Sequence, residues 1–190
     1  DEDTRIRFTF EGRLRPDAAR AVAALKALGL TVEVLSGDVA GPVAHVAAAA
    51  GIDRTAAGLT PFEKVARLDA LKSEGRKVLM VGDGLNDAAA LARAHASMAP
   101  GSAVDASQNA ADMVFSGQGL ESVPFSIRVA RDARRRALEN FAFSALYNVV
   151  AAPAAIFGLV NPLVAAVAMS GSSLVVTLNA LRMNLTGGRR

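Results

Sequence analysis

The chain has 190 residues, of which 52% are hydrophobic and 21% charged, so it is one ordinary domain, or a small domain with an appendage, and not a disordered chain. It contains no cysteine, which excludes a disulfide framework, a zinc-finger site and a cysteine nucleophile. Residues 1–127 carry 13 basic and 16 acidic side chains, net −3, whereas residues 128–190 carry 8 and 2, net +6. Because the positive charge is confined to one segment, the overall +3 does not indicate nucleic-acid binding.

Short β-branched runs alternate with Ala-rich and Leu-rich amphipathic stretches over the first part of the chain. The pattern predicts a helix over 17–28, ended by Gly29, and strands over 6–10, 31–35, 55–59, 78–81 and 112–115. This alternation predicts an α/β domain with a mainly parallel sheet covered by helices. Ligands of such domains bind at the carboxyl ends of the strands, so the functional residues are expected there.

Two segments place polar groups at such ends. Ser36 and Gly37, in Leu-Ser-Gly-Asp at 35–38, can donate hydrogen bonds to phosphoryl oxygens, and the alternative is a plain serine turn. The sequence Thr-Pro-Phe-Glu at 60–63 is typical of a capped helix start. Lys64 would then project from the first turn, where its ammonium could neutralise a transferring phosphoryl group, and the alternative is a solvated surface lysine.

The strongest motif is Val-Gly-Asp-Gly-Leu-Asn-Asp at 81–87, directly after an apolar run. The glycines allow a tight turn that exposes the Asp83 carboxylate, with Asn86 and Asp87 at the start of the next helix. Oxygen ligands so placed suit Mg²⁺ together with a phosphate group. The alternative is a strand-to-helix turn in which Asp87 is an ordinary N-cap.

Two uncharged stretches of twenty residues follow, over 141–160 and 162–181, each long enough to cross a bilayer as a helix. Basic residues precede the first stretch and follow the second: Arg128, Arg131, Arg134, Arg135, Arg136, Arg182, Arg189 and Arg190. The positive-inside rule therefore predicts a transmembrane hairpin with both ends cytoplasmic and a turn at Asn161-Pro162. A buried helical hairpin of a soluble protein is the alternative, given the Ala-rich composition and Pro153. The arginine face could also contact anionic headgroups.

Ser36, Lys64 and the Gly-Asp-Gly-x-x-Asp motif at 82–87 together resemble the haloacid dehalogenase-like phosphoryl-transfer domain. With Leu-Arg-Pro-Asp at 14–17 and the paired apolar stretches, nearly the whole chain resembles the C-terminal part of a heavy-metal P-type ATPase. The resemblance implies an incomplete phosphorylation domain over 1–120, a basic linking helix over 121–140, two transmembrane helices over 141–181 and a cytoplasmic tail over 182–190.

The resemblance also implies residue roles. Asp83 is expected to bind Mg²⁺, with Asn86 and Asp87 shaping the same loop and Asp87 assisting the cofactor. Ser36, Gly37 and Lys64 are expected to hold the phosphoryl oxygens, with Asp38 positioning them. Ser36 replaces the usual threonine and Ala89 the usual proline, and neither change removes a ligand.

In the family, ATP phosphorylates an aspartate in an Asp-Lys-Thr-Gly-Thr motif, which this sequence lacks. The chain is therefore expected to be the last portion of a longer transporter, without the nucleotide-binding domain and inactive alone. The missing strand would lie in the middle of the sheet. A membrane-tethered haloacid dehalogenase-like phosphatase and a non-catalytic truncated fragment are the competing hypotheses.

Neither apolar stretch contains a charged side chain, which argues against the zinc branch of the family with its lysine and aspartate. Five residues match the copper(I) branch instead and are expected to contact transported copper: Tyr147, Asn148, Met169, Ser172 and Ser173. A thioether suits a soft monovalent ion. The alternative is that these residues only pack the helices.

Segments around 94–100, 109–112 and 168–173 resemble the subgroup that supplies copper for assembly of cbb3-type cytochrome oxidase. The expected partners are the lipid bilayer, the remainder of the transporter and a copper chaperone or oxidase-assembly protein, with no nucleic acid. The expected location is a bacterial cytoplasmic membrane, multi-pass, with the soluble domain and C-terminus cytoplasmic. His45 and His95 are expected to be packing or surface residues.

Overall fold

A computed structural model describes residues 14–117 and 119–187, without the side chains of residues 162 and 182–187. The chain divides into two compact units, one ending at Pro124 and one beginning at Phe125. We call the described residues 14–124 the head unit and 125–187 the helix pair. The strand predicted over 6–10 lies outside the described residues.

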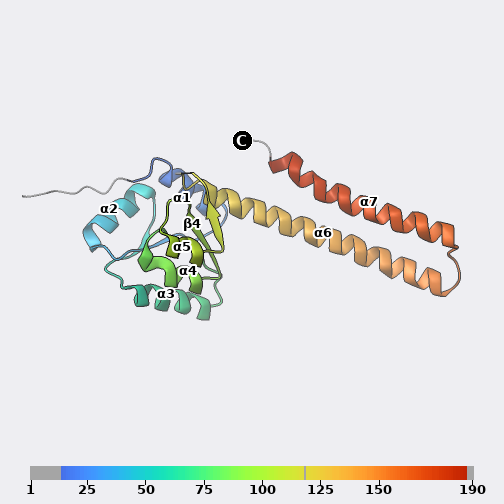
Figure 1. Cartoon of the computed structure of the whole chain (residues 1–190), viewed down its shortest axis with the longest axis horizontal. Coiled ribbons are helices and arrows are strands. Elements are labelled where there is room, and N and C mark those ends of the chain that lie inside the picture. Colours follow the sequence, from blue (N-terminus) through green and yellow to red (C-terminus); the bar gives the residue numbers. More distant parts are fainter. Residues whose placement is uncertain (1–13, 118, 188–190) are drawn as a thin grey trace, which may run out of the picture. The chain divides into compact units, whose positions relative to one another are not determined.

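The head unit alternates helices and strands in the order expected of an α/β domain (Figure 1). The predicted helix after residue 17 is confirmed, and it ends before Gly29, which has φ +77°. In chain order the elements are α1 (Ala18–Ala27), β1 (Glu33–Leu35), α2 (Ala40–Ala50), β2 (Arg54–Ala56), α3 (Pro61–Ser73), β3 (Leu79–Val81), the 3-10 turn η1 (Leu85–Asp87), α4 (Ala88–Arg93), β4 (Ala96–Pro100), α5 (Asp105–Ala110) and β5 (Met113–Phe115).

Every strand pairing in the described part of the head unit is parallel, as predicted. The strands form two sheets, however: β1 pairs with β2, with Val34 opposite Thr55, and a second sheet has the order β3-β4-β5. The prediction of an α/β domain with parallel strands is therefore confirmed, and in the described residues those strands are divided between two sheets. Parallel pairing still brings the carboxyl ends of β1 and β2 to one edge, and those of β3, β4 and β5 to another.

The central strand of the second sheet, β4, was not predicted. Its sequence, Ala-Ser-Met-Ala-Pro, lacks the β-branched and aromatic residues that mark strands. Four of its five residues are nevertheless buried, because β4 pairs with a strand on each side. Burial between two partners fixes this segment where its own propensity is weak.

Helix α3 holds the two sheets together. Its inner face contributes Leu68 to a core with Met80 of β3 and Leu91 of α4. On the other side, the Arg67 guanidinium donates to both carboxylate oxygens of Glu33 in β1, at 2.9 and 3.0 Å. One helix therefore packs on the second sheet while its arginine binds the first.

The helix pair consists of α6 (Ser122–Ile156), which begins in the last residues of the head unit, and α7 (Pro162–Gly187) (Figure 1). The turn between them uses Gly158 at φ +70°, and Leu159 donates its N–H to the Ala154 carbonyl. The Asn161 side chain accepts the Val164 N–H at 2.8 Å, which caps α7 in the manner expected of Asn before Pro.

Among the described residues, one helical segment is long and apolar enough to cross a membrane, Leu163–Leu181 in α7. The span predicted over 141–160 is wrong at its end, because α6 stops at Ile156 and the following residues form the turn. The apolar part of α6 is thus shorter than its uncharged sequence suggested.

Candidate phosphoryl and ion sites

The loop after β3 presents the Asp83 carboxylate at the carboxyl end of the second sheet. The Asp83 side chain is 65% exposed, and one guanidinium nitrogen of Arg15 lies 3.9 Å from its Oδ2. The loop backbone is fixed from α5: Ser107, which is fully buried, donates its hydroxyl to the Gly84 carbonyl at 2.5 Å. Val104 donates its N–H to the Asp83 carbonyl at 3.3 Å. The Asp83 carboxylate is therefore exposed, while the backbone of its loop is fixed by hydrogen bonds from Ser107 and Val104.

Asp87 stands at the N-cap position of α4, but its side chain makes no capping hydrogen bond to that helix. Its Oδ1 accepts a hydrogen bond from the Lys64 ammonium at 2.7 Å, and its Oδ2 accepts a weaker one from the Gly84 N–H at 3.4 Å. Lys64 is 7% exposed, which also excludes the solvated surface lysine. Removing either member of such a pair would leave a buried charge without its partner.

Glycine is required at position 82 by the approach of Asp87. A Cβ added to Gly82 would lie 2.8 Å from the Cβ of Asp87, closer than side chains tolerate. At Gly84 the same addition would lie 3.5 Å from the Asp87 carboxylate, an ordinary contact. The first glycine of the motif thus makes room for the carboxylate that holds Lys64.

Ser36 lies in a local turn at the end of β1. The Ser36 hydroxyl oxygen accepts the Asp38 N–H at 3.1 Å, which is the serine turn considered from the sequence. Gly37 and Asp38 are exposed, and a Cβ at Gly37 would meet the Leu59 carbonyl at 3.3 Å. Within the described residues, no hydrogen bond is donated by the Ser36 hydroxyl or by the Gly37 N–H.

Hydrogen bonds link the Ser36 turn to the start of α3, and α3 to the loop that carries Asp87. The Ser36 carbonyl accepts the Leu59 N–H at 2.9 Å, and Leu59 directly precedes the Thr60 cap of α3. Lys64, in the first turn of that helix, then bonds to Asp87. These bonds link the Ser36 turn to the start of α3, and Lys64 of that helix to Asp87, while Asn86 lies exposed in the same loop as Asp83.

The first turn of α3 is fixed by the predicted capping box. Thr60 donates its N–H to Glu63 at 2.8 Å, and its hydroxyl accepts the Glu63 N–H at 3.3 Å. The Thr60 backbone bond, followed by its side-chain bond, holds the pKa of the Glu63 carboxyl below its usual range. Since Lys64 follows Glu63, this cap also sets the position of the lysine.

The described donors suit Mg²⁺ only as part of a larger set. No three His, Cys, Asp or Glu side chains gather into a metal-binding group within the described ranges. Mg²⁺ commonly binds one or two carboxylates, keeps several waters and takes its other ligands from phosphate oxygens. The exposed Asp83 carboxylate fits that role, whereas Asp87 is engaged by Lys64.

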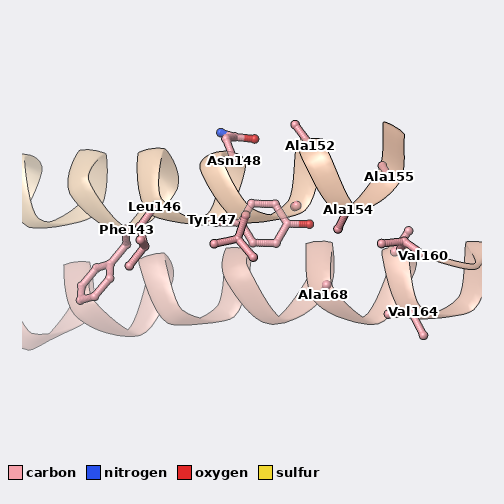
Figure 2. Close-up of a pocket in the computed structure, with 13 residues that line it drawn as sticks. Phe143, Leu146, Tyr147, Asn148, Ala152, Ala154, Ala155, Val160, Val164 and Ala168 are labelled. Atoms are coloured by element: carbon pink, nitrogen blue, oxygen red, sulfur yellow. The ribbon is translucent and has the colours of Figure 1, made fainter. Parts of the chain in front are cut away.

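The five residues expected to contact copper lie around one hollow in the helix pair. Its volume is about 390 Å³, and its lining includes Tyr147, Asn148, Met169, Ser172 and Ser173. A neighbouring apolar hollow of about 640 Å³ continues toward the turn, and Figure 2 shows the Tyr147 ring projecting between the two helices there. Two helices thus contribute one thioether and four polar side chains to a shared space.

Two polar side chains of this hollow form hydrogen bonds within their own helices. Asn148 donates to the Ser144 carbonyl at 2.9 Å, and Ser172 donates to the Met169 carbonyl at 2.9 Å. Their oxygen atoms keep lone pairs for a cation. Met169 is 69% exposed, so the residue is accessible to a ligand.

Sequence reasoning missed Arg15 and Ser107. Arg15 lies in Leu-Arg-Pro-Asp at 14–17, and an arginine before a helix start is one available signal for an anion site. Ser107 carried no signal, because its contact joins residues 23 positions apart.

Residues 3–95 match the haloacid dehalogenase-like hydrolase family. The "Nitrogen fixation protein FixI" of Rhizobium leguminosarum bv. viciae is 51% identical over 183 residues, 96% of this chain and 24% of that protein. The "Copper-exporting P-type ATPase" of Mycobacterium tuberculosis (strain ATCC 25618 / H37Rv) is 42% identical over 90% of this chain and 23% of its own length. The chain thus spans about a quarter of the length of these relatives.

Among solved structures, a zinc-transporting PIB-type ATPase in the E2.Pi state superposes with a TM-score of 0.85 at 31% identity. The match covers 91% of this chain and 28% of the transporter. A match of that coverage includes helices as well as the α/β domain.

Proposed function

This chain belongs to the heavy-metal P-type ATPases, and from that premise we propose that it works as the C-terminal part of an ATP-driven copper(I) export pump. The pump would act through an aspartyl-phosphate intermediate in a bacterial cytoplasmic membrane. The observation that carries the choice of ion is the hollow that brings Tyr147, Asn148, Met169, Ser172 and Ser173 together without a charged side chain.

In the head unit, the phosphorylated aspartate would come from an Asp-Lys-Thr-Gly-Thr segment outside these 190 residues. Lys64 would place its ammonium beside the phosphoryl oxygens, held there by Asp87. Ser36 and Gly37 would donate hydrogen bonds to the same oxygens, with Asp38 completing the turn. Preorganised donors of this kind stabilise the charge of a transferring phosphoryl group.

Asp83 would hold Mg²⁺, which, when bound, neutralises charge on the phosphoryl oxygens. Arg15 lies close enough to the same carboxylate to balance its charge when no cation is present. Asn86 and Asp87 shape the loop from which Asp83 extends. ATP would reach this edge from the nucleotide-binding domain of the complete transporter.

In the helix pair, both helices would cross the bilayer as a hairpin with the head unit on the cytoplasmic side. Large apolar side chains are exposed along them, such as Phe141 at 71%, Ile156 at 81% and Leu163 at 73%. A soluble hairpin would have to bury such surface, so the exposure favours lipid and other transporter helices as surroundings.

Two features favour copper(I) over the zinc carried by the structural relative. A thioether is a soft ligand that suits a soft monovalent ion, and the hydroxyl and amide oxygens add neutral contacts. A divalent ion in a low-dielectric site would need compensating charge, and residues 141–181 contain none. One relative is named for nitrogen fixation, and this similarity supports the proposal that the pump belongs to the subgroup that supplies copper to cbb3-type oxidase. The copper would pass through a chaperone or an assembly partner.

Replacing Met169 tests the ion assignment. In the complete transporter, Met169→Leu preserves bulk and removes the sulfur, so copper(I) affinity in a competition titration should fall about tenfold, equivalent to roughly 1.4 kcal/mol. Met113→Leu makes the same chemical change on a half-exposed strand of the head unit and should leave the affinity unchanged. Equal affinities in both variants would assign Met169 to packing alone.

The coding sequence upstream of this chain distinguishes the pump from the competing functions. If its gene encodes Cys-Pro-Cys and Asp-Lys-Thr-Gly-Thr ahead of this chain, the pump is supported. An open reading frame without them would leave the tethered phosphatase or a non-catalytic fragment as the explanation.

A further inference from the structure

Polar side chains also meet farther along the helix pair, beyond the hollow. Asn179 of α7 donates through Nδ2 to the Asn140 side-chain carbonyl at 2.8 Å, and the same nitrogen lies 3.3 Å from the Glu139 carboxylate. Asn179 is 8% exposed although it lies on a helix whose apolar residues are largely exposed. We call Glu139, Asn140 and Asn179 the amide clasp.

The amide clasp lies on the two helix faces that line the hollow. On α7, Met169, Ser172 and Asn179 are separated by three and seven residues, which places them along one face. On α6, Asn140, Ser144 and Tyr147 follow at spacings of four and three. Seven residues of helix correspond to about 10 Å, so the clasp lies about two turns from the hollow.

The clasp joins one helix to the other, unlike the polar contacts nearer the hollow. Asn148, Ser172 and Thr177 donate to carbonyls of their own helices, so those bonds do not fix one helix against its neighbour. The Asn179 bonds do, because a slip of α7 by one residue would move Asn179 by 1.5 Å and break them.

The surroundings make the clasp sensitive to loss of a partner. Glu139 also faces Arg135, whose Nε lies 3.8 Å from Oε1. Arg136, one turn before Asn140, is 7% exposed, and its Nε has no hydrogen-bond partner in the described part of the chain. A buried polar group left without a partner costs free energy, so the clasp favours one relative position of the helices.

We propose that Asn179 is a positioning residue for the ion site. By fixing the register of α7 against α6, it holds the Met169 sulfur opposite Tyr147 and Asn148 in the arrangement that binds copper(I). The inference rests on the proposed function of the hollow. It adds a requirement outside that hollow, because none of the clasp residues lines it.

The test measures copper(I) affinity by competition titration in the complete transporter carrying Asn140→Ala, Asn179→Ala, both changes, or Asn140→Asp. Each alanine variant should weaken binding about three- to tenfold, the worth of one net hydrogen bond. The double variant should be no weaker than the worse single variant, because both remove the same interaction. Asn140→Asp keeps the acceptor for Asn179 and should stay within about twofold of the parent.

Unchanged affinity in the alanine variants would overturn the inference, as would equal weakening by Asn140→Asp and Asn140→Ala. If Asn179→Ala fails to fold, the two Asn140 variants decide the question alone. Met169→Leu serves as the reference: weakening there without weakening by the clasp variants contradicts the positioning role only, whereas no weakening by Met169→Leu contradicts the proposed ion site itself.

Discussion

The two units position their candidate site residues in different ways. In the head unit, the important side chains bond across elements: Lys64 of α3 to Asp87 after β3, and Ser107 of α5 to the Gly84 carbonyl. In the hollow of the helix pair, Asn148 and Ser172 bond to the backbone of their own helices. The candidate phosphoryl site in the head unit therefore contains side chains that already bond to one another, whereas the candidate ion site depends on how its two helices are aligned.

This difference predicts that a substitution in the head unit changes phosphorylation but not copper(I) affinity, and that a substitution in the helix pair does the reverse. Replacing the Asp83 carboxylate is expected to have the largest effect. In the complete transporter, Asp83→Ala should lower Mg²⁺-dependent phosphorylation by ATP by at least about a hundredfold, because it removes the carboxylate proposed to hold Mg²⁺ beside the phosphoryl group. The assay is incorporation of the terminal phosphate of labelled ATP.

Copper(I) affinity of the same Asp83→Ala protein is the matching control and should stay at the parental value. Normal phosphorylation of the variant would contradict the metal role of Asp83. A parallel loss of copper(I) binding would contradict the separation of the two sites.

The second-largest expected effect is a loss of stability when Gly82, which makes space for Asp87, is replaced. Gly82→Ala places a Cβ 2.8 Å from the Asp87 Cβ, so Asp87 must move and its bond to Lys64 weakens. Overpacking of this kind costs about 1–3 kcal/mol of unfolding free energy. Denaturant titration of the complete transporter, monitored in the phosphorylation domain, measures the loss.

Gly84→Ala is the matched control, because its Cβ would meet Asp87 at an ordinary 3.5 Å. It should destabilise the protein less than Gly82→Ala. Equal losses at both positions would show that the approach of Asp87 is not what requires glycine at position 82.

The smallest effect comes from the capping box of α3. Since the folded pKa of Glu63 is lowered, its contribution to stability is full above the ordinary carboxyl range, about pH 4.3, and is lost as the pH falls through the folded pKa. Glu63→Gln should therefore flatten the acid side of a plot of stability against pH. An unchanged acid limb would exclude Glu63 as a contributor to it.

Local patterns in the sequence predicted local features of the structure well. The capping box at Thr60 and Glu63 depends on neighbours within a few residues, and it is present. The hairpin turn predicted at Asn161-Pro162 forms just before these residues, around Gly158, and Asn161 caps α7. The strand β4 and the Ser107 contact could not be predicted in this way. Their positions are determined by partners far along the chain, against weak local propensity in Ala-Ser-Met-Ala-Pro.

The candidate sites show the same contrast between features that local sequence predicts and features that depend on distant residues. Sequence motifs identified Asp83, Asp87 and Lys64, but not that Asp87 would bond to Lys64 instead of capping α4. In the helix pair, the uncharged sequence predicted a first span to residue 160, whereas α6 ends at Ile156. Helix length depends on where the turn forms, which the absence of charge does not specify.

The metal dependence of ATP hydrolysis decides whether copper(I) is the transported ion. Purified complete transporter in lipid vesicles would be supplied with copper(I) or zinc(II) at matched free concentrations. We expect stimulation by copper(I) and little by zinc(II), because the hollow offers a thioether and neutral oxygens and no carboxylate. Stimulation by zinc(II) alone, or by neither ion, would contradict the assignment of copper(I).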